Sequence, residues 1–178
     1  MGNMEALYNT WKAIGVSGGD LSFFQNFFVK FYQAFIEADR WLQYLNGVKT
    51  TLLVTALALI LGVALGVTVA ILRTAHDQQR PGHRNPVLAV LNLVCKIYVT
   101  VIRGTPMMVQ LLIMGFVIFA SSRNFTMIGT LTLGINSGAY VSEIVRGGLM
   151  SVDKGQMEAG RSLGLGYGTT MRFVIVPQ

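Results

Sequence analysis

The sequence predicts an all-α polytopic membrane protein, with three readable transmembrane helices preceded by an amphipathic N-terminal helix. Its 178 residues are 52% hydrophobic and only 12% charged, whereas a soluble domain of this length would need more charge on its surface. Three stretches are long enough to cross a bilayer as uncharged helices, which satisfy their own backbone hydrogen bonds in lipid. The net charge of +6 therefore bears on membrane orientation, and we expect no nucleic-acid partner.

The N-terminal part lacks a membrane span. Residues 1–20 form a mixed, glycine-containing lead, which we expect to be loose or partly helical. Leu21–Tyr44 then has helical periodicity, with six apolar residues gathered on one side: Phe24, Phe27, Phe28, Phe31, Phe35 and Ile36. Charges recur too often here for a span, so the pattern favours a helix lying at the membrane surface. A helix packed against its transmembrane neighbours is the alternative. Trp41 and Tyr44 stand where interfacial aromatic residues are expected.

The first predicted span is Thr50–Leu72, which contains no charged residue. As a helix it would be about 35 Å long, enough to cross a hydrocarbon core of about 30 Å. Gly62 and Gly66 form a GxxxG step that permits close helix packing. A loosely packed, lipid-facing helix with incidental glycines is equally compatible with the sequence.

Arg73–Pro86 is a short loop with three arginines against one aspartate. The positive-inside rule places this loop in the cytoplasm, so the first span runs inward and the N-terminus lies outside. His76 and His83 have no cysteine or carboxylate at ligand spacing, so we interpret them as loop residues and expect no metal site.

Val87–Ser122 is interrupted by Lys96 and Arg103. We expect the part before Gly104 to be a cytoplasmic-side helix, either amphipathic or packed in the bundle. Pro106 lacks a backbone donor and disfavours helical geometry at the residue before it. Gly104–Ser122 is then the second, uncharged span.

The third predicted span is Phe125–Ser142, and the helix continues to Gly148. Gly134 and Gly138 form a second GxxxG step. Polar side chains within the span face either the bundle or a wet cavity, or else make interhelical hydrogen bonds that only hold the bundle together. Further along, Glu143 and Arg146 have the spacing to pair along one helix face.

The last segment, Ser151–Gln178, is polar at its start and rich in glycine. Asp153 is a predicted N-cap, with Gln156 able to complete a capping box. A helix from residue 154 to 163 follows, stopped by Gly164 and Gly166. A second helical run over 169–176 leads to Pro177. Such a helix–bend–helix is a docking element rather than a span, and an ordinary helical hairpin is the alternative.

This segment resembles the EAA loop of ABC importer permeases, which reads E-A-A, three residues, G, nine residues, I, one residue, L-P. The spacing fits throughout, and the matching positions are Glu158, Ala159, Gly160, Gly164, Val174, Val176 and Pro177. Three identities depart from the pattern, because Gly160 replaces the second alanine and valines replace the isoleucine and leucine. Glycine costs about 1 kcal/mol of helix propensity relative to alanine.

The resemblance extends upstream, because Tyr98–Gln110 and Ser137–Glu158 are similar to the polar-amino-acid branch of these permeases. It covers 47–178 and implies a transmembrane permease domain there, with 1–46 as an extracytoplasmic and interfacial segment. The family continues into further membrane helices after the loop, so we expect a C-terminally truncated permease of the bacterial plasma membrane.

The resemblance also implies partners and sites. A permease of this family pairs with a second copy, identical or related, with ATPase subunits and with an external substrate-binding protein. The ATPase-docking residues would be Glu158, Ala159, Gly160, Gly164 and Pro177, on the cytoplasmic side. Independently of the resemblance, polar and charged residues in or next to the predicted spans are candidates for the substrate pathway: Arg103, Thr105, Asn136, Ser137, Tyr140 and Glu143. A hinge or a plain kink is an alternative role for the stretch from Arg103 to Pro106.

No enzymatic constellation is readable in the sequence. Ser151 and Lys154 match SxxK without the companion motifs of a penicillin-binding enzyme. No GxxxxGK[ST] loop occurs, so ATP phosphates are not bound in that way and the energy must come from another polypeptide. We therefore expect a permease subunit without catalytic residues or a cofactor. A secondary transporter and a non-transporting membrane scaffold are the alternatives, and neither needs a polar docking motif.

Overall fold

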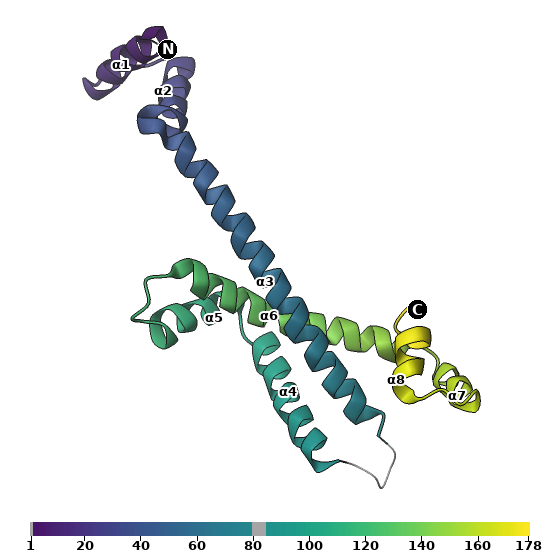
Figure 1. The fold of residues 1–178 in the computed structure, drawn as a ribbon. Coiled ribbons are helices and arrows are strands. Elements are labelled where there is room, and N and C mark those ends of the chain that lie inside the picture. Colours follow the sequence, from purple (N-terminus) through teal and green to yellow (C-terminus); the bar gives the residue numbers. More distant parts are fainter. Residues whose placement is uncertain (1, 80–84) are drawn as a thin grey trace. The chain divides into compact units, whose positions relative to one another are not determined.

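The computed structural model describes residues 2–79 and 85–178, and within these ranges the regular elements are all helical. They form two compact units, Met1–Leu52 and Leu53–Gln178. The elements in chain order are α1 (Gly2–Val16), α2 (Phe23–Phe35), the short 3₁₀ helix η1 (Glu37–Asp39), α3 (Arg40–Asp77), α4 (Pro86–Gly104), α5 (Met107–Ile113), the π-helical turn η2 (Met114–Ile118), α6 (Phe125–Ser151), α7 (Lys154–Ser162), α8 (Tyr167–Thr170) and the π-helical turn η3 (Met171–Ile175) (Figure 1).

In the first unit, α1 packs on α2 through aromatic rings. Tyr8 stacks on Tyr32 with 4.3 Å between ring centroids, and Trp11 meets Phe28 edge-on at 5.3 Å. Aromatic pairs of this geometry stabilise helix contacts beyond their buried area. The predicted lead is therefore helical over most of its length, because α1 finds an apolar surface on α2.

The prediction of one helix over Leu21–Tyr44 is wrong, since α2 ends at Phe35 and a new helix begins at Arg40. Ala38 and Asp39 between them have φ values of 55° and 54°, which break helical geometry. Two side chains of α1 contact the break. Lys12 Nζ and the Tyr8 hydroxyl donate hydrogen bonds of 2.7 and 2.8 Å to the same carboxylate oxygen of Glu37, in η1. These contacts, the Glu37 hydrogen bond first, raise the pKa of the Lys12 ammonium above its usual value.

In the second unit, α3 and α6 cross at their glycine steps (Figure 1). A Cβ added at Gly62 would lie 2.7 Å from the Ser137 Cβ, and one added at Gly66 would lie 2.6 Å from the Val141 Cβ. In the other direction, a Cβ added at Gly138 would lie 3.4 Å from the Gly62 carbonyl oxygen. The predicted close packing is confirmed, and the glycines are not incidental.

Helix α4 packs beside this crossing. Val69 of α3 forms a buried cluster with Cys95 and Val99 of α4. The Tyr98 hydroxyl donates a hydrogen bond to the backbone carbonyl of Ile135 in α6. The three long helices of this unit are therefore joined by both apolar and polar contacts.

The predicted second span is wrong in its bounds. By length and composition the candidates for crossing a membrane are residues 37–77, which include the predicted first span, and α4, Pro86–Gly104. The stretch Met107–Ile118 is apolar but too short. The two charges in α4 misled the sequence analysis, but one of them, Arg103, stands in the last turn of α4. Long cationic side chains near a helix end reach the membrane surface.

The predicted third span lies within α6, which runs on to Ser151. Its 27 residues are enough to cross a bilayer, but its polar residues make it less apolar than the other two. Helix α6 brings the chain to the C-terminal segment, where the predicted docking residues lie.

Candidate functional site

The C-terminal segment begins with a capped helix. The Asp153 carboxylate accepts a hydrogen bond of 2.6 Å from the Gly155 amide, which confirms the predicted N-cap. The capping box is not formed as predicted, because Gln156 donates its backbone amide to the Asp153 carbonyl instead. Helix α7 then runs to Ser162, close to the predicted end.

The end of α7 is a Schellman motif centred on Gly164. The φ of Gly164 is +77°, its amide donates to the Arg161 carbonyl, and the Leu165 amide donates to the Gly160 carbonyl, each at 2.9 Å. The predicted glycine stop is confirmed at this residue. Gly166 has an ordinary φ of −68° and instead provides the N-cap of α8.

The structure separates the predicted docking residues by their surroundings. Glu158, Ala159 and Pro177 are exposed, and a Cβ added at Gly164 would have no atom within 4 Å. Gly160 differs, because it is buried within the chain.

Gly160 packs directly on Thr170 of α8. A Cβ at Gly160 would lie 2.5 Å from the Thr170 Cγ2 and 2.7 Å from its Oγ1. Thr170 is itself fully buried and donates its hydroxyl to the Gly166 carbonyl at 3.1 Å. The departure from the E-A-A pattern therefore has a local reason, since only glycine lets α7 approach α8 this closely. At this position the small residue serves internal packing rather than an open surface.

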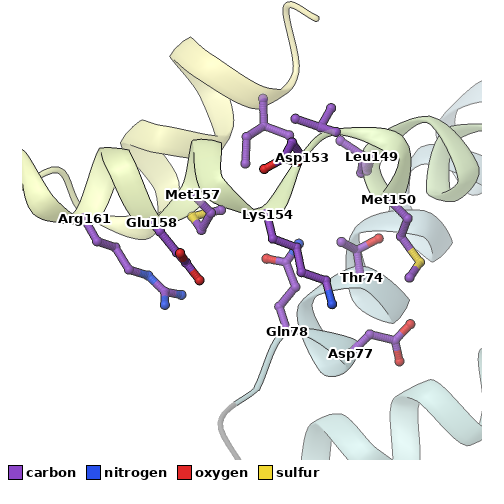
Figure 2. Close-up of a pocket in the computed structure, with 12 residues that line it drawn as sticks. Thr74, Asp77, Gln78, Leu149, Met150, Asp153, Lys154, Met157, Glu158 and Arg161 are labelled. Carbon is purple, nitrogen blue, oxygen red and sulfur yellow. The ribbon is translucent and has the colours of Figure 1, made fainter.

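A cleft of about 320 Å³ lies where α7 meets the ends of α3 and α6 (Figure 2). Its walls carry both signs of charge, from Asp77, Asp153, Lys154, Glu158 and Arg161, and its apolar lining includes Met150 and Met157. Figure 2 shows the Lys154 side chain extending toward the end of α3, near Gln78. The cleft therefore combines charged and apolar side chains, as the surfaces of protein–protein interfaces do.

The hydroxyl groups of Thr74, which lines this cleft, and of Tyr167, which belongs to α8, have different surroundings. The buried Thr74 hydroxyl has no hydrogen-bond partner among the residues that the structure describes. On α8, burial raises the pKa of the Tyr167 hydroxyl, and the positive charge of Arg161 opposes that shift.

A group of charged side chains joins the three long helices. The Glu143 carboxylate of α6 forms an ion pair with Arg73 of α3, and Arg103 of α4 lies 3.6 Å from its other oxygen. Arg146 lies 3.8 Å from Glu143, which confirms the predicted pair, and also 3.3 Å from Asp77. The sequence analysis missed Arg73 as a partner, since its only signal was a charge directly after an uncharged span.

The six predicted pathway residues belong to three separate groups of contacts. Arg103, Tyr140 and Glu143 come together, with the Arg103 guanidinium 5.3 Å from the Tyr140 ring centroid. Ser137 lies instead at the crossing of α6 with Gly62. Thr105 and Asn136 form the third group.

Thr105 and Asn136 are joined through Gln110, a buried residue of α5 that the sequence analysis did not select. The Gln110 amide donates to the Thr105 hydroxyl at 2.7 Å, and the Asn136 amide donates to the Gln110 carbonyl oxygen at 3.0 Å. The sequence feature that could have indicated Gln110 is its single amide side chain in an otherwise apolar helix. A cleft of about 230 Å³, mostly apolar, lies beside Thr105 and Gln110, between α4, α5 and α6.

His76 is held by side chains of its own unit, with its Nδ1 3.0 Å from the Asn92 amide nitrogen. The other histidine of the predicted loop, His83, lies outside the described residues, as do Arg80 and Arg84.

Comparison with known proteins identifies the family. Residues 87–178, more than half of the chain, match the family described as "Binding-protein-dependent transport system inner membrane component". The glutamine transport system permease protein GlnP of Escherichia coli is 35% identical over 140 residues, covering 75% of this chain and 58% of that protein. The arginine transport system permease protein ArgU of Corynebacterium glutamicum is 35% identical over 143 residues, covering 72% and 42%.

A solved structure supports the same assignment. The crystal structure of an amino acid ABC transporter with histidines matches with a TM-score of 0.58 and 36% identity, covering 77% of this chain and 63% of that chain. The chain thus spans about six tenths of the length of several proteins that it resembles. Because the matched region is more than half of the chain, the chain belongs to the family of binding-protein-dependent transport system inner membrane components.

Proposed function

We propose that the chain is part of the permease subunit of an ABC importer that carries polar amino acids across the bacterial plasma membrane. The observation that carries this proposal is the geometry of α7, a capped, exposed helix with the EAA spacing that follows directly from α6. The names of the glutamine and arginine permeases support amino acids as the substrate class.

In this proposal α7 is the element that an ATPase subunit binds. Glu158, Ala159, Gly164 and Pro177 face the ATPase, while Gly160 fixes α7 on α8. Helix α7 is separated from α6 only by Val152 and Asp153, so a displacement of α7 is passed to a helix that lies among α3 and α4. ATP-driven closure of two ATPases would draw two such loops together and reorient the permease helices.

The pathway is proposed to run past Arg103, Tyr140 and Glu143. The Arg103 guanidinium beside the Glu143 carboxylate offers a charged partner to each end of an amino-acid zwitterion, and Tyr140, which is 45% exposed, lies beside Arg103. Asn136 and Thr105 are joined to Gln110 by hydrogen bonds, so for these two a role in holding α4, α5 and α6 together is the better-supported one.

The proposed topology has the N-terminus outside, with the loop between α3 and α4 and the docking segment in the cytoplasm. The partners are a second permease copy, two ATPase subunits and an extracytoplasmic substrate-binding protein. The subunit itself performs no chemistry in this scheme, since its ATPase partner hydrolyses the nucleotide.

Uptake in proteoliposomes tests the proposal. The full-length permease is reconstituted with its ATPase and binding protein, and uptake of radiolabelled glutamine, arginine and histidine is measured with and without ATP inside. We expect uptake of at least one of them that requires ATP, the ATPase and the binding protein together. Uptake driven by an ion gradient without the ATPase would indicate a secondary transporter, and absence of any uptake by an assembled complex would favour a scaffold.

A further inference from the structure

Helix α2 has one covered face and one open face. On the covered face Val29 is buried, and Tyr32 and Phe28 hold the rings of Tyr8 and Trp11 of α1. On the open face five phenylalanines, called here the α2 phenylalanine face, are exposed by 78, 79, 62, 45 and 42%: Phe23, Phe24, Phe27, Phe31 and Phe35. An apolar surface of this extent marks an interaction site.

The α2 phenylalanine face continues onto the next helix. Ring centroids are 6.3 Å apart between Phe27 and Phe31 and 4.9 Å apart between Phe31 and Phe35. Phe35 then lies 5.1 Å from Tyr44, in the first turns of α3. The rings therefore form one row that crosses the break between the two helices.

The start of α3 around Tyr44 also exposes apolar side chains, those of Trp41, Leu42, Leu45, Val48 and Leu52. This part of α3 leads into the uncharged stretch that begins at Thr50, whose length and composition suit a bilayer crossing. Along the chain, the α2 phenylalanine face therefore directly precedes a stretch whose composition suits lipid.

We infer that the α2 phenylalanine face is buried in the boundary between headgroups and acyl chains, and that α1 and α2 form a membrane anchor ahead of the first span. The occupant is lipid, and α1 forms the side of the anchor away from it. Helices that lie in this boundary place phenylalanine, leucine and tryptophan in the acyl region and keep polar residues out of it. On α2 the exposed Asn26 and Lys30 flank the row of rings. This role is independent of ATPase docking.

The test places fluorescent labels on both sides of α2 in the full-length protein in lipid vesicles. Single cysteines at Phe27→Cys and Asn26→Cys, in a Cys95→Ala background, carry a bimane label, and Phe31→Cys provides a second position on the face. Quenching is measured with lipids that bear a nitroxide near the headgroup end of the acyl chain, and separately with iodide in the water. Size-exclusion chromatography confirms that each labelled variant is monodisperse.

We expect lipid quenching at positions 27 and 31 to be several-fold stronger than at 26, and iodide quenching to be strongest at 26. Equal lipid quenching at all three positions would overturn the inference. Labels at 27 and 31 that are shielded from both quenchers would overturn it as well, because they would show a protein partner, such as a second permease copy, on this face.

Discussion

Replacing Gly160 with alanine restores the family's E-A-A pattern, yet the structure predicts that it loosens the loop. The new Cβ would lie 2.5 Å from the Thr170 Cγ2 and 2.7 Å from its Oγ1, closer than real side chains approach. Thr170 is fully buried and its hydroxyl is bonded to the Gly166 carbonyl, so it cannot simply rotate away. Helix α8 must therefore shift from α7.

Two opposing effects set the magnitude. Alanine gains about 1 kcal/mol of helix propensity over glycine, while overpacking a close contact costs about 1–3 kcal/mol. The net loss is therefore about 0–2 kcal/mol for Gly160→Ala. Thr170→Ala removes the two closest atoms and should rescue the variant, with a coupling energy of about 1 kcal/mol or more between the two positions.

Amide hydrogen exchange of the α7 residues in the full-length protein measures this effect. A loss of about 1.4 kcal/mol in local stability corresponds to a tenfold faster exchange. Gly168→Ala is the matched control, because a Cβ there meets no atom within 4 Å and exchange should not rise. The reasoning is refuted if Gly160→Ala slows exchange as the control does, or if Gly160→Ala and Thr170→Ala act additively.

Three further sets of substitutions test other features of the structure. Gly164→Ala should cost about 1 kcal/mol, because the φ of +77° strains a side chain, and Gly164→Asn should cost less in the same exchange assay; equal effects would argue against the backbone explanation. Arg73→Glu should lower the free energy of unfolding by about 1–3 kcal/mol, measured by thermal unfolding. Adding Glu143→Arg to this variant should restore part of the loss. Absence of any rescue would mean that the ion pair does not form. Lys12→Met and Glu37→Gln should each release α1, so that chymotrypsin cuts after Leu21, in the α1–α2 turn, more rapidly than in the unaltered protein. Unchanged cleavage would contradict the role of this contact.

Features set by local sequence were predicted well. The N-cap at Asp153 and the stop at Gly164 depend on residue types at fixed offsets, so they were readable. The two GxxxG steps could be predicted as sites of close helix packing, but the sequence does not indicate that they pack against each other. The break after Phe35 was not readable, because Ala38 has no turn preference and its positive φ depends on contacts made by α1.

Candidate-site contacts between distant segments were the least predictable. The Glu143–Arg146 pair follows from i, i+3 spacing, whereas the Glu143–Arg73 pair joins residues of two helices that are 70 positions apart in the sequence. Gln110 bridges Thr105 and Asn136 only once the break at Pro106 has turned α5 back toward α6. No local pattern in a single sequence indicates contacts between such distant residues.

The central claim is that α7 docks an ATPase, and the most direct measurement is co-purification of the ATPase with variants of the full-length permease. Glu158→Lys reverses a charge on the exposed face of α7, and Gln156→Lys is the control, with a new lysine on the other side of the same helix. Disrupting a charged contact at an interface costs about 2–5 kcal/mol, which is roughly thirtyfold to several-thousandfold in affinity.

We predict that Glu158→Lys inserts into the membrane normally but loses the ATPase and substrate-stimulated ATP hydrolysis, while Gln156→Lys keeps both. Normal ATPase binding and normal stimulation with Glu158→Lys would contradict the docking role of α7, and with it the proposed importer.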